Sequence, residues 1–198
     1  MNITAVTPSA TQAGPHPDFS GRPRRIKLDQ VIAIKGIGKL VLRPIHLLDE
    51  KEMAQLHHGI LNESIYLRYF EHYHLDWRTV HERLVRICTN IPESYAIVAE
   101  RTATAYHPMA ILAIGRLTTT SKPFAAAFAT LITDQAQPSK LPKVLLTRLI
   151  KIAQAFGFRT LNGELLVADH DTLNLCRALD FSLQTFPQNG LVRVTLDL

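Results

Sequence analysis

The sequence has few of the features that mark a secreted, membrane-spanning or metal-binding protein. Only two of its 198 residues are cysteine, and Cys88 and Cys176 lack CxxC spacing, which argues against a disulfide framework and a cysteine-based zinc site. No apolar run reaches the roughly 20 residues of a membrane-spanning helix, and the N-terminus lacks the pattern of a secretory signal. We therefore expect a cytoplasmic protein whose two thiols are reduced and buried, with a catalytic cysteine as the alternative interpretation.

The charge is positive but not extreme. A net charge of +5 allows an anionic ligand without indicating nucleic acid, and no nucleic-acid or membrane partner is expected. Residues 1–28 are rich in proline, serine, threonine, glycine and glutamine, so we predict a flexible tail followed by one folded domain over residues 29–198. The basic cluster in this tail either contacts a polyanion or is simply solvated; it comprises Arg22, Arg24, Arg25 and Lys27.

The stretch from Phe124 to Gly157 organises the rest of the chain. Phe124–Thr133 has small or apolar residues on both alternating faces, which is typical of a central strand covered on both sides. From Pro142 the apolar period changes to that of an amphipathic helix, and Gly157 supplies a left-handed residue to end it. A strand that feeds a helix through a short loop leaves free backbone N–H groups at the helix start, where anions bind.

The first part of the domain is predicted to hold a hairpin and two helices. Gln30–Lys35 and Lys39–Pro44 flank two glycines and form the hairpin. The run Asp49-Glu50-Lys51-Glu52 has the spacing of a capping box and should start the first helix. Asn62–Phe70 is interpreted as a polar and aromatic connection, and Arg78–Cys88 as the second helix.

Strands dominate the second part. Asp169 is placed to cap a further helix that ends near Leu179. This order of elements predicts an α+β fold with one sheet covered on both faces. The remaining strands are expected at Tyr95–Glu100, Ala110–Thr119, Thr160–Val167, Phe181–Phe186 and Leu191–Leu198.

Several sequence runs resemble the GNAT acyltransferase superfamily, and most of all the acetyltransferase module of bacterial protein lysine acetyltransferases. The resemblance extends from about Lys39 to Phe186 and implies a mixed, mostly antiparallel sheet with helices on both faces. The residues that carry it are Leu42-Arg43-Pro44-Ile45, Ser64-Ile65-Tyr66-Leu67-Arg68-Tyr69-Phe70, His81-Glu82-Arg83-Leu84, Leu175-Cys176-Arg177, Leu179 and Phe181.

The resemblance implies transfer of an acyl group from acetyl-CoA or another acyl-CoA to an amine, either a protein lysine or a small amine. The resemblance places the acceptor-side wall at Tyr66, Arg68, Tyr69 and Phe70. The alternative is that these aromatic side chains anchor the segment to the core. The residues expected to hold the acyl-CoA are Leu131, Ile132, Thr133, Gln137, Ser139, Lys140, Leu141, Lys143 and Asp169.

The loop expected to bind the diphosphate departs from the pattern of the resembling family. That pattern is Gln or Arg, two residues, Gly, one residue, then Gly or Ala. Here Gln137 is kept, but Lys140 and Pro142 replace the small residues. Proline removes a backbone donor, and a hydrogen bond to a charged group contributes about 1.5–3 kcal/mol. Lysine side chains restore attraction to phosphate if they point inward, and otherwise they are the solvated start of a helix.

The residue that takes the amine proton is also missing. The resembling enzymes commonly carry a glutamate where this chain has Ala127, and alanine cannot accept a proton. Glu100 and Asp134 are candidate substitutes, although each is also explained as an exposed carboxylate at a strand end. No metal is expected, because the neighbouring histidines have no third ligand at a recognisable spacing.

Two hypotheses follow from these departures. The first is an acyl-CoA-dependent N-acyltransferase whose activity with acetyl-CoA is weak or absent. The second is a domain of the same fold that lacks catalysis and serves as a binding or regulatory module. Calorimetric titration with acetyl-CoA separates them.

Overall fold

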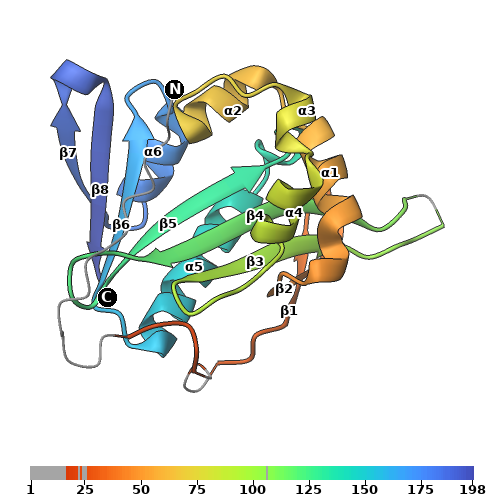
Figure 1. Cartoon of the computed structure of the whole chain (residues 1–198), viewed down its shortest axis with the longest axis horizontal. Helices are drawn as coiled ribbons and strands as arrows, with labels where there is room; N and C mark the ends of the chain where they lie inside the picture. Colours follow the sequence, from red (N-terminus) through yellow and green to blue (C-terminus); the bar gives the residue numbers. More distant parts are fainter. Residues whose placement is uncertain (1–16, 22, 24–25, 106) are drawn as a thin grey trace.

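A single mixed sheet forms the centre of the domain (Figure 1). The computed structural model describes residues 17–21, 23, 26–105 and 107–198. Within these residues the sheet has eight strands in the order β1-β2-β3-β4-β5-β6-β8-β7. The strands are β1 Gln30–Ile34, β2 Gly38–Pro44, β3 Ser94–Arg101, β4 Ala110–Thr119, β5 Ala125–Ile132, β6 Thr160–Leu166, β7 Ser182–Phe186 and β8 Leu191–Asp197.

Helices cover both faces of the sheet, as the sequence predicts (Figure 1). The helix α5 packs on one face through leucine and isoleucine side chains that are fully buried, and the helix α1 packs on the other through Met53 and Leu56. The helices are α1 Glu50–His58, α2 Asn62–Tyr69, α3 Leu75–Arg78, α4 His81–Ile87, α5 Leu141–Phe156 and α6 His170–Arg177.

The one parallel pairing in this sheet is short. Strands β5 and β6 pair only at Ala125–Ala127 with Thr160–Asn162, whereas the antiparallel neighbours β4 and β5 pair over seven positions. Beyond Ala127 the two strands separate, although β5 continues for five more residues to Ile132. The edge of β5 that faces β6 is therefore open in the middle of the sheet.

The structure confirms the helix ends and the hairpin glycines that local sequence patterns predict. Helix α5 has a proline in its first turn and ends at Gly157 with φ of 93°, the left-handed conformation that glycine adopts without strain. Asp169 caps α6, because its carboxylate accepts a hydrogen bond from the Thr172 amide at 3.1 Å. The glycines of the first hairpin also have positive φ, 83° at Gly36 and 103° at Gly38. Cys88 and Cys176 are buried and unbridged, which confirms the prediction of structural thiols.

Between β2 and β3, two predictions are wrong and one predicted helix begins later than expected. The segment interpreted as a connection is mostly the helix α2, which ends at Phe70 in a left-handed conformation. The helix predicted for Arg78–Cys88 is α4, but it begins later, at His81, and Arg78 instead ends the separate short helix α3. The capping box lies one turn earlier than predicted, where Asp49 accepts from the His46 amide, and α1 has no side-chain cap of its own.

Part of the predicted tail belongs to the folded domain. Phe19 is 7% exposed, its amide donates to the carbonyl of Pro92, and its ring lies 5.0 Å from the rings of Phe156 and Phe158. The aromatic contact anchors the chain across the end of α5. Most of the tail, including Arg22, Arg24 and Arg25, lies outside the described residues.

Candidate functional site

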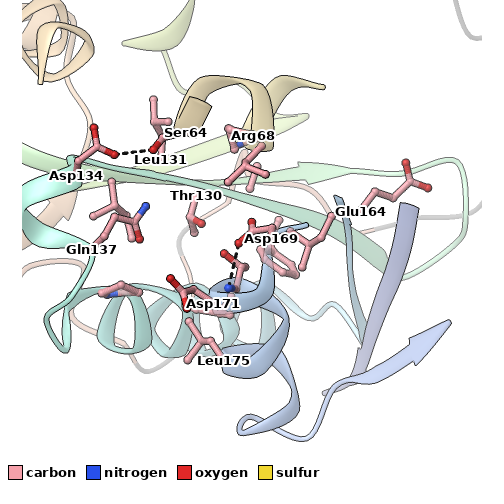
Figure 2. A pocket seen from close by; sticks show the side chains of 18 residues that line it. Ser64, Arg68, Thr130, Leu131, Asp134, Gln137, Glu164, Asp169, Asp171 and Leu175 are labelled. Carbon is pink, nitrogen blue, oxygen red and sulfur yellow. Dashed lines mark hydrogen bonds between the residues drawn. The ribbon is translucent and has the colours of Figure 1, made fainter. Parts of the chain in front are cut away.

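A cavity of about 270 Å³ lies where β5 and β6 separate. Strand β5 forms one wall, and the helices α2, α5 and α6 contribute the others. Figure 2 shows Thr130 in the middle of the cavity, with Asp134 and Gln137 at one end and Asp169 and Asp171 on the α6 side. Several residues predicted to hold the acyl-CoA are thereby brought together: Leu131, Ile132, Gln137 and Asp169.

The open edge of β5 presents backbone groups to this cavity. The Thr133 amide donates to Leu112 of β4 at 2.9 Å, so this amide and the backbone groups of Leu131 face β4. Because backbone groups alternate along a strand, Thr130 and Ile132 direct theirs to the other edge, where β6 no longer pairs. Neither of these two amides has a hydrogen-bond partner among the described residues. Of the three predicted strand residues, Ile132 therefore offers backbone groups to the cavity, and Thr130 joins it.

The loop between β5 and α5 has already used most of its amides. Gln137 donates to the carbonyls of Thr133 and Asp134, Ser139 donates to Ala136, and Leu141 donates to the Ser139 hydroxyl at 3.0 Å. Two further positions are prolines and have no amide hydrogen. Within the described residues, the amides left without a partner between the end of β5 and the first turn of α5 are those of Gln135, Lys140 and Lys143. The helix start thus offers fewer donors to an anion than an all-amide loop.

The other side chains of this loop differ in position. Gln137 and Pro142 line the cavity. Lys140 and Lys143 are exposed and outside its lining, and Leu141 is fully buried in the core. Ser139 is turned inward to its own loop, since its hydroxyl donates to the Ala136 carbonyl at 2.6 Å.

Neither candidate substitute for the base is free at the cavity. Glu100 is ion-paired with Arg43, whose Nε lies 2.6 Å from the carboxylate, on the side of β3 that pairs with β2. Asp134 lines the cavity, but its two oxygens accept from the Leu61 amide and the Ser64 hydroxyl, each at 2.6 Å (Figure 2). These bonds tie the loop after β5 to the start of α2.

Sequence reasoning missed two carboxylates in this region. Glu164 of β6 lines the cavity and also a neighbouring one that contains Ala127. Its carboxylate pairs with Arg193 at 2.9 Å and points away from the other labelled side chains in Figure 2. Asp171 lines the cavity from the first turn of α6. No local signal marks either residue, because their position depends on the register of β6 and on the packing of α6.

The residues predicted for the acceptor side lie along α2 and its end. Arg68 lines the β5–β6 cavity, and its Nε is buried without a hydrogen-bond partner. Burial lowers the pKa of this guanidinium. Tyr69 lies under it, with its ring centroid 5.2 Å from the guanidinium carbon, and Phe70 lines the cavity around Ala127. Tyr66 stacks on His72 at 4.6 Å instead.

The part of the chain that the structure describes has neither a metal-binding cluster nor a membrane-spanning helix. No three histidine, cysteine, aspartate or glutamate side chains there are grouped to hold a metal ion. No helix in it has the length and apolar character to cross a membrane.

Several solved structures have the same arrangement. The GNAT domain of PAT from S. lividans aligns with a TM-score of 0.72 at 20% identity, over 86% of this chain and 97% of that one. RimJ from Mycobacterium smegmatis, solved with a CoA disulfide, aligns at 0.65 and 10% identity, over 85% and 86%. The putative acetyltransferase yncA from Salmonella typhimurium, solved with acetyl-CoA, aligns at 0.58 and 14% identity, over 80% and 94%.

No protein-family model matches the sequence. At these identities the structural likeness establishes the fold. This likeness agrees with the eight-stranded, mostly antiparallel sheet that has helices on both faces. The chain therefore has the fold of the GNAT acetyltransferases.

Proposed function

We propose that this protein binds an acyl-CoA between β5 and β6 and transfers its acyl group to an amine. The observation that carries the proposal is the open edge of β5. The unpartnered backbone groups of Thr130 and Ile132 face a cavity that ends at Gln137 and Pro142, at the start of α5. An extended arm with amide groups can pair with such an edge as an added strand does, and the pantetheine arm of CoA carries two amides. Two of the structures with this fold contain CoA or acetyl-CoA.

In the reaction, the lone pair of a neutral amine attacks the thioester carbonyl carbon. A C–N bond forms, the C–S bond breaks, and the proton lost by the nitrogen ends on the sulfur of CoA. The chain's contribution is to hold the thioester along β5 and to exclude water from the cavity. Ala127 gives no proton acceptor at the expected position. The carboxylate of Glu164 lines the cavity that contains Ala127, but it is paired with Arg193.

The loop between β5 and α5 offers few hydrogen-bond donors to the diphosphate of an acyl-CoA. Two prolines remove donors, and internal hydrogen bonds occupy four of the loop's amides, those of Ala136, Gln137, Ser139 and Leu141. The exposed Lys140 and Lys143, with their two free amides, supply the remaining attraction. We therefore expect acetyl-CoA to bind more weakly than to a loop with glycines at these positions, and turnover to be slow.

Calorimetric titration with acetyl-CoA tests the proposal. Saturable binding is expected, and Thr130→Pro should abolish it, because proline removes an amide that faces the cavity and leaves the hydrogen bonds to β4 in place. Thr130→Ala keeps that amide and should bind as the natural protein does. Thermal unfolding of both variants checks that the sheet is intact. Equal binding by folded Thr130→Pro and Thr130→Ala would contradict the role of the β5 edge.

A second function is favoured by Ala127 and by the occupied amides of the loop: a module that keeps the fold and does not catalyse. Release of CoA thiol distinguishes the two functions. Saturable binding of acetyl-CoA without thiol release over a panel of amines supports the module, whereas amine-dependent release supports the acyltransferase.

A further inference from the structure

A further cavity, of about 530 Å³, lies on the face of the sheet that carries α1. It is lined by α1, α2, α3 and α4 over the strands β4 and β5. Four guanidinium groups line it, from Arg68, Arg83, Arg86 and Arg116, and we call it the arginine cavity. Its lining includes no aspartate or glutamate. Such a volume suits a small molecule, which typically occupies 300–1,000 Å³.

The arginines of this cavity have no acidic partners. Within the described residues, the acidic side chains that form ion pairs do so with Arg43, His81 and Arg193, none of which lines it. Arg116 donates to the Ser94 hydroxyl at 2.7 Å and to the Ile87 carbonyl, which are neutral acceptors. The positive charge of the cavity is therefore uncompensated.

Two of these side chains also have unused donors. The Nε atoms of Arg68 and Arg83 are buried without a hydrogen-bond partner. The guanidinium of Arg83 is held in place by Trp77, whose ring centroid lies 4.0 Å from it. Unpartnered buried donors carry a free-energy cost that a bound acceptor removes. A planar guanidinium fork matches carboxylate and phosphate groups.

The arginine cavity adjoins the β5–β6 cavity. Arg68, Ala129 and Leu131 line both. A molecule whose anionic group lies among the arginines can thus reach toward the place proposed for the thioester. Nearby cations also lower the pKa of a bound amine, because like charges disfavour its protonated form. This supplies the neutral nucleophile without a glutamate at Ala127.

We propose that the arginine cavity binds the acceptor, and that the acceptor is a small amine bearing a carboxylate or a phosphate on the same molecule. The proposal rests on the proposed acyl transfer. It disfavours an acceptor recognised through positive charge alone.

Binding can be measured without catalysis, because the chain has one tryptophan and Trp77 lines the cavity. The probes are L-glutamate, O-phospho-L-serine and putrescine, titrated at constant ionic strength while Trp77 fluorescence is recorded. All three carry amines, but putrescine has no anionic group. A saturable change is expected with L-glutamate, O-phospho-L-serine or both, and the responding probe identifies the anion. No saturable change with either, or an equal change with putrescine, overturns the proposal.

Variants locate the binding. Arg86→Gln and Arg68→Gln should each lower the affinity for the responding anion by about ten-fold or more, which is the effect of losing one hydrogen bond to a charged group. Arg177→Gln makes the same change of charge at an exposed position on α6 that lines neither cavity and should leave the affinity unchanged. If Arg86→Gln and Arg68→Gln bind the anion as tightly as Arg177→Gln does, the anion does not bind in the arginine cavity and the proposal is wrong.

Calorimetry with acetyl-CoA on the same protein separates this proposal from the proposed function. If acetyl-CoA binds and neither L-glutamate nor O-phospho-L-serine binds, the acceptor proposal is wrong and acyl-CoA binding is retained. If an anion binds the cavity and acetyl-CoA does not bind, the acceptor role is overturned together with acyl transfer. Release of CoA thiol with the responding anion, and none with putrescine, supports both.

Discussion

His57 is a fully buried histidine with no hydrogen-bond partner on either ring nitrogen. Burial, together with the charges of Arg78 and Arg83, lowers its pKa to about 4. The side chain is therefore neutral in the folded protein at pH 5, whereas in the unfolded chain, with an ordinary pKa of about 6.5, it is protonated. Since the unfolded state binds the extra proton, folding is weakened as the pH falls from about 6.5 toward 4.

The change from pH 7 to pH 5 tests this directly. We expect His57 to account for a loss of about 2 kcal/mol in the free energy of unfolding, from the two pKa values above. Urea denaturation at both pH values measures it. His57→Leu should reduce the loss by this amount, and His58→Leu, which changes an exposed neighbour, should not. An unchanged pH dependence in His57→Leu would show that His57 titrates normally.

Pro142 is the residue that most limits donors at the start of α5. It lies in the first turn, where amides need no intrahelical acceptor, and it lines the cavity. Pro142→Ala restores one amide at that position, so we expect acetyl-CoA to bind about ten-fold more tightly, which corresponds to one hydrogen bond to a charged group.

The matched control is Pro138→Ala. It restores an amide in the same loop at a residue outside the cavity lining. Calorimetry of the three proteins with acetyl-CoA compares them. Equal affinities, or the larger gain in Pro138→Ala, would refute the explanation of the weakened diphosphate grip.

At the level of elements, strong local patterns predicted the structure well and packing decided the rest. The apolar period of α5, the cap at Asp169 and the two glycines of the first hairpin are encoded in neighbouring residues, and each was located correctly. Helix α2 was missed, because its mixed polar and aromatic residues lack a clear apolar face and only Ile65 is buried. The helix predicted from Arg78 begins only at His81, because Arg78 belongs to the separate short helix α3.

The candidate site was only partly predictable. The strand, the loop and Asp169 were identified because the resemblance extends through them. The separation of β5 from β6 is a property of pairing between distant segments, so the roles of Thr130 and Glu164 had no local signal. The four arginines of the arginine cavity come from α2, α4 and β4, and only the fold brings them together.

Gly163 sets the distance between β6 and the core at the point where the sheet opens. A Cβ atom there would lie 2.6 Å from Cε1 of Phe128 and 3.0 Å from Cγ2 of Val194. The Phe128 ring is 7% exposed and packs edge to face on Phe181, so it has little room to move. We expect Gly163→Ala to lower the free energy of unfolding by about 1–3 kcal/mol through overpacking.

Urea denaturation measures this effect, with Gly21→Ala as the control because a Cβ atom there meets no atom within 4 Å. Equal stability of the two variants would mean that Phe128 repacks freely. The close approach of β6 to the core would then be no reason for glycine at this position.

At the scale of the whole molecule, Arg68 lies between two cavities with opposite charge. The β5–β6 cavity is lined by carboxylates of β6, α6 and the loop after β5, whereas the arginine cavity has cationic groups without acidic ones. This division fits an uncharged pantetheine arm on one side and an anionic acceptor on the other. The open edge of β5 is the feature on which the whole account depends.

Amide hydrogen exchange along β5, with and without saturating acetyl-CoA, tests that feature most directly. The account predicts that exchange at Thr130 and Ile132 slows when acetyl-CoA binds. Leu131 and Thr133 serve as internal controls, because their amides already point to β4 and should keep the same protection. Unchanged exchange at Thr130 and Ile132 with acetyl-CoA bound would contradict the account.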